Sequence, residues 1–133
     1  MAQVKVLVID DDEGMTELLE LLLSPTSTIL IANTGSEGVE LARKCSPDII
    51  ILDLMMPGMD GWEVCRAIRE FSRVPILILS ALDSSDIAAA ALDAGADDFL
   101  TKPVSTATLL ARLNRLLKRS HISSPSLYAA GPA

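Results

Sequence analysis

Residues 49–61 read Ile-Ile-Ile-Leu-Asp-Leu-Met-Met-Pro-Gly-Met-Asp-Gly, which changes abruptly from apolar to loop-forming residues. Four consecutive apolar residues, mostly β-branched, predict a strand that is buried on both faces, as in a parallel sheet. Pro57, Gly58 and Gly61 predict a loop after it. Asp53 therefore stands where a buried strand meets its carboxyl-end loop, which is where open α/β sheets bind ligands. An isolated acid there could merely cap the next turn, so its role depends on partners elsewhere in the chain.

The rest of the chain alternates between strand and helix patterns. We expect strands over residues 4–9, 28–32, 48–52, 74–79 and 98–101, and helices over residues 13–23, 36–45, 61–71, 84–94 and 106–118. Short loops and crossover helices predict a single α/β domain with a doubly wound, right-handed, five-stranded parallel sheet. Residues 1–119 would form this domain. Residues 120–133 have no periodicity and are expected to be a flexible tail or the start of a linker to an output domain.

Composition excludes several classes of protein. The net charge of -7 argues against a nucleic-acid-binding surface in this segment, because phosphate contacts need clustered Lys and Arg. No apolar run is long enough for a signal peptide or a membrane span, so we expect a cytoplasmic location. Cys45 and Cys65 lack metal-ligand spacing, and we expect two small buried thiols in a reducing cytosol.

Polar side chains follow the predicted strands where each strand ends. Asp10 and Asp11 follow the first strand, Asp53 the third, Ser80 the fourth and Lys102 the fifth. These residues should meet in one cleft, because the carboxyl ends of parallel strands share one edge of the sheet. Three close carboxylates repel one another, and a few oxygen ligands with room for water and phosphate suit Mg²⁺. A metal-bound carboxylate nucleophile with a hydroxyl and a lysine predicts a phosphoryl-transfer site.

Each of these residues also has a simpler interpretation. The acids at 10–12 could be solvated charges and a helix cap, which is the preferred interpretation for Asp12. Ser80 could be a turn residue, and Lys102 an ordinary surface lysine.

Four stretches occur in a characteristic order: Val-Ile-Asp-Asp-Asp (8–12), Pro-Asp-Ile-Ile-Ile-Leu-Asp-Leu-Met-Met-Pro-Gly-Met-Asp-Gly (47–61), Pro-Ile-Leu-Ile-Leu-Ser-Ala (75–81) and Gly-Ala-Asp-Asp-Phe-Leu-Thr-Lys-Pro (95–103). Together they resemble a response-regulator receiver domain, the phosphoacceptor half of two-component signalling. The resemblance covers roughly residues 4–119. It implies a flavodoxin-like (βα)5 fold and a signalling domain that is not an enzyme but contributes to its own phosphorylation and dephosphorylation.

The resemblance also implies the roles of the acids. Asp53 would accept a phosphoryl group from the phosphohistidine of a sensor histidine kinase or a phosphotransfer protein. Asp11 and Asp53, with the backbone carbonyl of Met55, would ligate Mg²⁺, for which Mn²⁺ or Ca²⁺ could substitute in vitro. Asp10 would act mainly through metal-bound water.

The resemblance further implies a switch. Ser80 and Lys102 would hold the phosphoryl oxygens, and Lys102-Pro103 would be a cis peptide. Phe99 would rotate inward as Ser80 moves toward the phosphate. The balance between two conformations of the face built from the fourth helix, fifth strand and fifth helix would then shift, because phosphorylation adds roughly two negative charges beside the metal and the lysine.

Some details concern the output of this switch. The pattern around Asp98 and Ala111-Arg112 is most like regulators with winged-helix DNA-binding outputs, so a part in transcription regulation is one expectation. Such regulators often form homodimers through that same face, where Asp98 and Arg112 could keep one ion pair between subunits. The alanine-rich segment 88–91 lacks the basic residues usual in such dimers, which leaves a more apolar contact as the alternative.

Two apolar residues predict slow self-dephosphorylation. Met55 and Leu82 follow Asp53 and Ser80 by two residues, where the family tends to flank the path of attacking water. Neither side chain can orient a water molecule, and both can exclude it.

Two alternatives remain at this stage. A haloacid-dehalogenase-type phosphatase would use Asp10 as nucleophile within an Asp-x-Asp signature that includes Asp12, although Gly14 and the absence of an obvious cap insertion are unlike that class. A degenerate receiver would serve only as a docking module.

Overall fold

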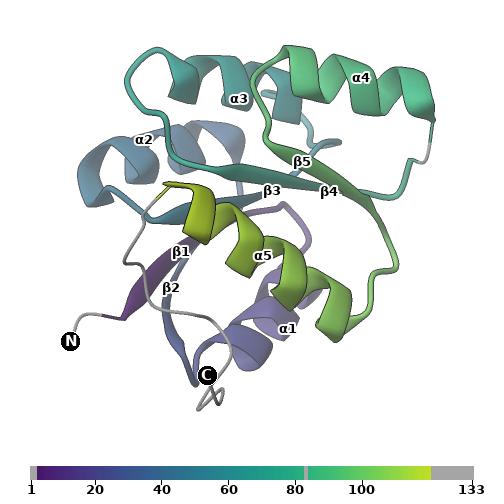
Figure 1. Ribbon diagram of the computed structural model, residues 1–133. Coiled ribbons are helices and arrows are strands. Elements are labelled where there is room, and N and C mark those ends of the chain that lie inside the picture. The colour runs from purple at the N-terminus through teal and green to yellow at the C-terminus, as the bar shows by residue number, and fades with distance from the viewer. Residues whose placement is uncertain (1–2, 83, 121–133) are drawn as a thin grey trace.

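The computed structural model describes residues 3–82 and 84–120 (Figure 1). The predicted tail or linker over 120–133 lies outside the described residues, apart from Ser120, which ends the last helix.

All ten predicted elements are present, in the predicted order. The strands are β1 (Val4–Ile9), β2 (Ser27–Ala32), β3 (Ile49–Asp53), β4 (Ile76–Ser80) and β5 (Asp98–Thr101). The helices are α1 (Glu13–Leu23), α2 (Gly35–Cys45), α3 (Gly61–Arg69), α4 (Ser85–Asp93) and α5 (Thr106–Ser120).

The five strands form one parallel sheet in the order β2-β1-β3-β4-β5, which confirms the predicted doubly wound α/β architecture. Helices α1 and α5 cover one face of the sheet, and α2, α3 and α4 cover the other (Figure 1). The order in which strands are added reverses at β1: β2 lies on one side of it, and β3, β4 and β5 follow on the other side. This reversal places the carboxyl ends of β1 and β3 side by side at the usual ligand-binding position of such sheets.

Two aliphatic cores hold the layers together, one on each face. Every residue of β3 is buried, as the apolar run of residues 49–52 predicts. Residues of β3 with even numbers pack toward α2, α3 and α4, and those with odd numbers pack toward α1 and α5, because side chains alternate along a strand. The central strand is therefore rigidly held, and so is the acid at its end.

Element boundaries differ from the predicted ones by up to two residues. Strand β4 begins at Ile76 and not at Val74, because Pro75 has no N–H and the carbonyl of Val74 accepts a hydrogen bond from Arg69 at 2.7 Å. Strand β3 extends to Asp53, so the acid is itself the last residue of the strand.

The expectation that Cys45 is buried was wrong, and burial along α1 does not follow its helical spacing throughout. Leu18 and Leu22 of α1 recur at helical spacing but are exposed, while Thr16, Leu19 and Leu23 are buried. Cys65 is buried, as expected, whereas Cys45 is only half-buried. Over the described part of the chain, no helix combines the length and the apolar character that crossing a bilayer requires.

Candidate functional site: an acidic pocket at the carboxyl edge of the sheet

The structure brings together the polar side chains that follow the strands. Asp10 comes directly after β1, Asp53 ends β3, Ser80 ends β4, and Lys102 comes directly after β5. One carboxylate oxygen from each of Asp10, Asp11 and Asp53 lies within 4.8 Å of the others. The predicted convergence of these acids is therefore confirmed as geometry.

The donor set of this cluster suits a hard divalent cation. Asp10 and Asp53 are buried and Asp11 is exposed, so the cluster has a solvent-facing side. All three side chains offer oxygen atoms, which Mg²⁺ prefers to nitrogen and sulfur as ligands. The solvent-facing side leaves room for the water molecules that Mg²⁺ usually keeps.

Asp12 belongs to the helix and not to the pocket. Its carboxylate accepts a hydrogen bond from the backbone N–H of Met15 at 3.2 Å and caps α1. The preferred interpretation of Asp12 as an N-cap is confirmed.

Lys102 joins two of the carboxylates. Its ammonium lies 3.2 Å from Oδ2 of Asp10 and 3.4 Å from Oδ1 of Asp53. Burial alone would lower the pKa of Lys102, but the charges of Asp10 and Asp53 outweigh it and raise that pKa above its ordinary value. The interpretation of Lys102 as an ordinary surface lysine is wrong. The Lys102-Pro103 peptide is cis, as the resemblance implies.

Ionisation of Asp53 is unfavourable in this pocket when no cation is bound. The pKa of Asp53 is raised from 3.8 to about 6. Burial is the largest cause and the Asp10 carboxylate is the next, and together they outweigh the opposing charge of Lys102. A bound cation would offset this cost.

Each polar group of Asp10, in its backbone and in its side chain, has a hydrogen-bond partner. Its backbone N–H donates to the carbonyl of Ala32 at 3.0 Å, and its carbonyl accepts from Nδ2 of Asn33 at 2.9 Å. Its Oδ1 accepts from the N–H of Asp12 at 3.0 Å. Asn33 lies outside the sequence motifs that point to the pocket. The signal was an asparagine placed directly after a strand whose neighbour ends in acids.

Ser80 and Phe99 lie on the two neighbouring strands β4 and β5. Ser80 is fully buried, and its Oγ accepts a hydrogen bond from the N–H of Leu82 at 3.1 Å. The carbonyl of Ser80 accepts from the N–H of Lys102 at 2.7 Å, which ties this residue to the lysine of the pocket. Phe99 is half-buried and packs against the core beneath α2, α3 and α4.

The residues expected to flank the pocket are exposed. Met55 is 54% exposed and Leu82 is 37% exposed. Asp98 pairs with Arg112 of the same chain, with Nη1 of the arginine 3.0 and 2.9 Å from the two carboxylate oxygens. The ion pair considered as a contact between subunits is thus made within one chain.

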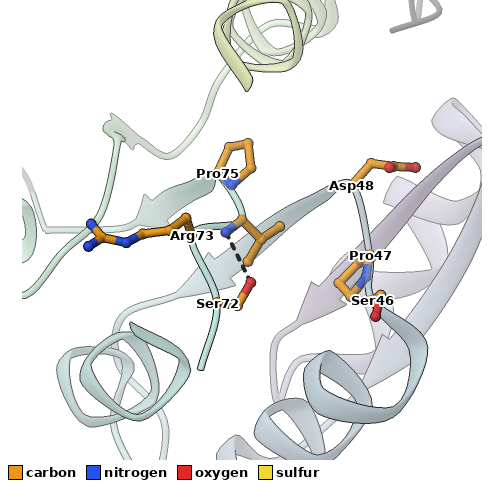
Figure 2. A pocket seen from close by; sticks show the side chains of 7 residues that line it. Ser46, Pro47, Asp48, Ser72, Arg73 and Pro75 are labelled. Atoms are coloured by element: carbon orange, nitrogen blue, oxygen red, sulfur yellow. Dashed lines mark hydrogen bonds between the residues drawn. The ribbon is translucent and has the colours of Figure 1, made fainter. Parts of the chain in front are cut away.

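A hollow lies at the opposite edge of the sheet (Figure 2). It is lined by residues of the α2–β3 and α3–β4 loops: Ser46, Pro47, Asp48, Ser72, Arg73, Val74 and Pro75. The side chains of Arg73 and Asp48 point away from each other in Figure 2, and no cluster of functional groups forms there. The chemistry is concentrated at the carboxyl edge, where the acids and the lysine meet.

Fold and site together define a class: a doubly wound parallel α/β domain with an acidic pocket, a lysine and a buried hydroxyl at the carboxyl edge of its sheet. A family model described as the response regulator receiver domain matches residues 6–114. The chain therefore belongs to the response regulator receiver domain family, and its flavodoxin-like fold is the receiver fold.

Solved structures agree. The receiver domain of Francisella response regulator 1452 is 36% identical, with 90% of this chain and 100% of that chain covered and a TM-score of 0.84. Vibrio cholerae chemotaxis protein CheY4 is 32% identical, with 86% and 99% covered and a TM-score of 0.80. The BeF3-activated N-terminal receiver domain of Klebsiella pneumoniae RstA is 32% identical, with 86% and 98% covered and a TM-score of 0.82.

Membership settles the class of function. Receiver domains are signalling phosphoacceptor domains of two-component systems and not classical enzymes; they bind Mg²⁺ at an acidic pocket and interact with histidine kinases or phosphotransfer proteins. The phosphatase alternative loses its support, because the chain belongs to a different family and Asp12, the second acid of that signature, caps a helix.

Proposed function

We propose that Asp53 accepts a phosphoryl group from the phosphohistidine of a sensor histidine kinase or a phosphotransfer protein, in a Mg²⁺-dependent reaction. The observation that carries this proposal is the environment of Asp53. A buried carboxylate at the end of the central strand lies within ion-pair distance of Lys102 and in one cluster with Asp10 and Asp11.

In the transfer, a carboxylate oxygen of Asp53 attacks phosphorus in line while the P–N bond to the imidazole breaks. The imidazole leaves with the electron pair of that bond, and the product is an acyl phosphate on Asp53. Lys102 would neutralise an equatorial oxygen of the phosphoryl group. Asp11, Asp53 and the Met55 carbonyl, with Asp10 acting through water, would hold Mg²⁺, which would supply further positive charge at the phosphoryl oxygens; Mn²⁺ or Ca²⁺ would substitute in vitro.

The buried hydroxyl of Ser80 is the proposed sensor of the new charge. In the unphosphorylated protein this hydroxyl is engaged by the N–H of Leu82. Movement of Ser80 toward the phosphoryl group would break that bond and leave space for the half-buried ring of Phe99. The balance between two conformations of the α4–β5–α5 face would shift as a result. This face would be the surface that binds a target or a second copy of the chain.

The proposed setting follows from the family. A cytoplasmic location and a kinase partner are typical of receiver domains, and we assign both to this protein as part of the proposal. No direct nucleic-acid binding by this domain is proposed, because its formal charge is -7.

The decisive experiment is incubation with a small phosphodonor such as acetyl phosphate and Mg²⁺, followed by mass spectrometry to locate the added group. The proposal predicts one phosphoryl group on Asp53, its absence without Mg²⁺, and its absence from Asp53→Asn. Modification of Asp10 would instead support the phosphatase alternative. No modification of the wild type would support a receiver that serves only as a docking module.

A further inference from the structure

The β1–β2 ladder continues past its last strand pair. The strands are in register up to Ile9 and Ala32. Beyond that pair, the N–H of Asp10 donates to the carbonyl of Ala32, and the side chain of Asn33 closes one more bond, from Nδ2 to the carbonyl of Asp10. Only the amide nitrogen of Asn33 can donate to a carbonyl, so its orientation is set by this contact.

Asn33 is anchored in turn to the first turn of α2. Its backbone N–H donates to Oε1 of Glu37 at 2.9 Å. The N–H of Glu37 donates to Oγ1 of Thr34, the N-cap of that helix, at 3.1 Å. The amide that holds Asp10 is therefore tied to a capped helix and not to a free loop.

The restraint on Asp10 reaches the other acids through the backbone. The carboxylate of Asp10 is held by the N–H of Asp12 and by Lys102. Asp11 lies between Asp10 and Asp12 and is exposed, and the described structure gives its side chain no hydrogen bond or ion pair. The backbone turn through Asp10 is thus what sets the distance from Asp11 to Asp53.

We infer that Asn33 is a positioning residue for divalent-cation binding by Asp10, Asp11 and Asp53. It deepens the proposed function, since it concerns the same pocket. Three carboxylates within 4.8 Å repel one another, and without a restraint they would relax apart in the metal-free protein. The Asn33 amide opposes that relaxation without touching the metal or the phosphoryl group. A cation then finds its ligands already ordered, and less of its binding free energy is spent on ordering them.

The test replaces Asn33 by Ala and, separately, by Leu, which has a similar volume but no donor. Mg²⁺ binding is measured by isothermal titration calorimetry and by the fluorescence of Trp62, the single tryptophan of the chain. We expect both variants to bind Mg²⁺ about tenfold more weakly, the scale of effect of residues that orient metal ligands.

Thermal unfolding with and without Mg²⁺ separates positioning from general support of the fold. A positioning role predicts that the rise in Tm on adding Mg²⁺ is smaller in the Asn33 variants than in the wild type, because that rise follows metal affinity. A merely structural role would lower Tm equally in both conditions and leave the Mg²⁺ dissociation constant unchanged. Such a result, or a dissociation constant within about twofold of the wild-type value, would overturn the inference.

Thr28→Ala is the matched control. Thr28 lies in the same strand as Ala32, toward its other end, and its hydroxyl donates to Oε1 of Gln3 at 3.1 Å. Loss of that hydrogen bond should leave Mg²⁺ affinity unchanged, and an equal loss of affinity in Thr28→Ala would contradict the inference. None of these readouts requires phosphorylation, so a wild type that binds Mg²⁺ but is not modified at Asp53 would defeat the proposed function and leave this inference standing.

Discussion

Met55 and Leu82 show how single side chains would set the lifetime of the signal. Met55 follows Asp53, the proposed phosphoacceptor, by two residues, and Leu82 follows Ser80, the proposed sensor, by two residues. Both Met55 and Leu82 expose apolar surface to solvent. An acyl phosphate is lost when a water molecule attacks it in line. A thioether and an isobutyl group would offer no hydrogen bond to orient that water, and their bulk would exclude it.

We therefore predict that phosphate loss from phosphorylated Asp53 is slow, and that Met55→Asn and Leu82→Gln each accelerate it by about tenfold. Release of phosphate after removal of the donor measures the rate. Leu21→Asn is the control, since Leu21 is 74% exposed on α1 and lies outside the pocket. A wild-type lifetime of seconds that polar residues at 55 and 82 do not change would contradict the prediction.

At the scale of elements, one arginine joins three parts of the fold. Arg69, the last residue of α3, donates from Nε to the carbonyl of Gly95, from Nη1 to that of Val74, and from Nη2 to Asp97 at 2.8 Å. The same oxygen of Asp97 accepts from the N–H of Ile76 at 2.8 Å. The contact fixes the start of β4 and the α4–β5 turn to the end of α3.

Replacement of Arg69 by Met should lower the free energy of unfolding by about 2–4 kcal/mol, because it leaves the half-buried Asp97 carboxylate without its counter-charge and removes the guanidinium donor from three carbonyls, those of Ser72, Val74 and Gly95. Urea unfolding measures this change. Arg66→Met, one turn earlier on α3 and exposed, removes the same charge and should change stability by no more than about 0.5 kcal/mol. Equal unfolding midpoints for the two variants would show that the Arg69 contacts do not stabilise the fold.

At the scale of the whole molecule, the acidic pocket makes metal-free stability depend on pH. The pKa of Asp53 is raised from 3.8 to about 6 by burial first and by Asp10 next. Between those two values the folded state binds more protons than the unfolded state. The contribution of Asp53 to stability therefore falls as pH rises through this window, and its full cost is present above about pH 6.

Asp53→Asn should accordingly raise metal-free stability by about 1–2 kcal/mol at neutral pH, where it removes a disfavoured charge, and have little effect below about pH 4. Added Mg²⁺ should reverse the order, because the cation stabilises the wild type more than the variant. Thermal unfolding against pH, in chelator and in Mg²⁺, measures both effects.

Asp60→Asn is the control for charge. It removes one carboxylate but keeps a residue that caps α3 equally well, so it should not reproduce this pH dependence. A metal-free Asp53→Asn protein that is less stable than the wild type at neutral pH would contradict the prediction.

Much of this molecule can be predicted from its sequence, because the signals are local. Runs of apolar residues define the strands, a capping residue such as Asp12 defines a helix start, and a parallel sheet places the carboxyl ends of its strands at one edge. Asp10, Asp53 and Lys102 can therefore be placed together from the sequence alone. The boundaries of β4 were less predictable, because the contact of Arg69 with Val74 comes from a separate helix.

Sequence alone determined the order of elements along the chain, the parallel and doubly wound character of the sheet and the identity of the residues at its carboxyl edge, since hydrophobic periodicity and chain connectivity carry that information. Only the tertiary structure decided which side chains hold these residues in place. Asn33 holds Asp10 across 23 positions and Arg69 holds Asp97 across 28. Such contacts depend on distances between elements, which no local pattern encodes. For the same reason, the exposure of Leu18 and Leu22 and the pairing of Asp98 with Arg112 inside one chain became visible only in the folded protein.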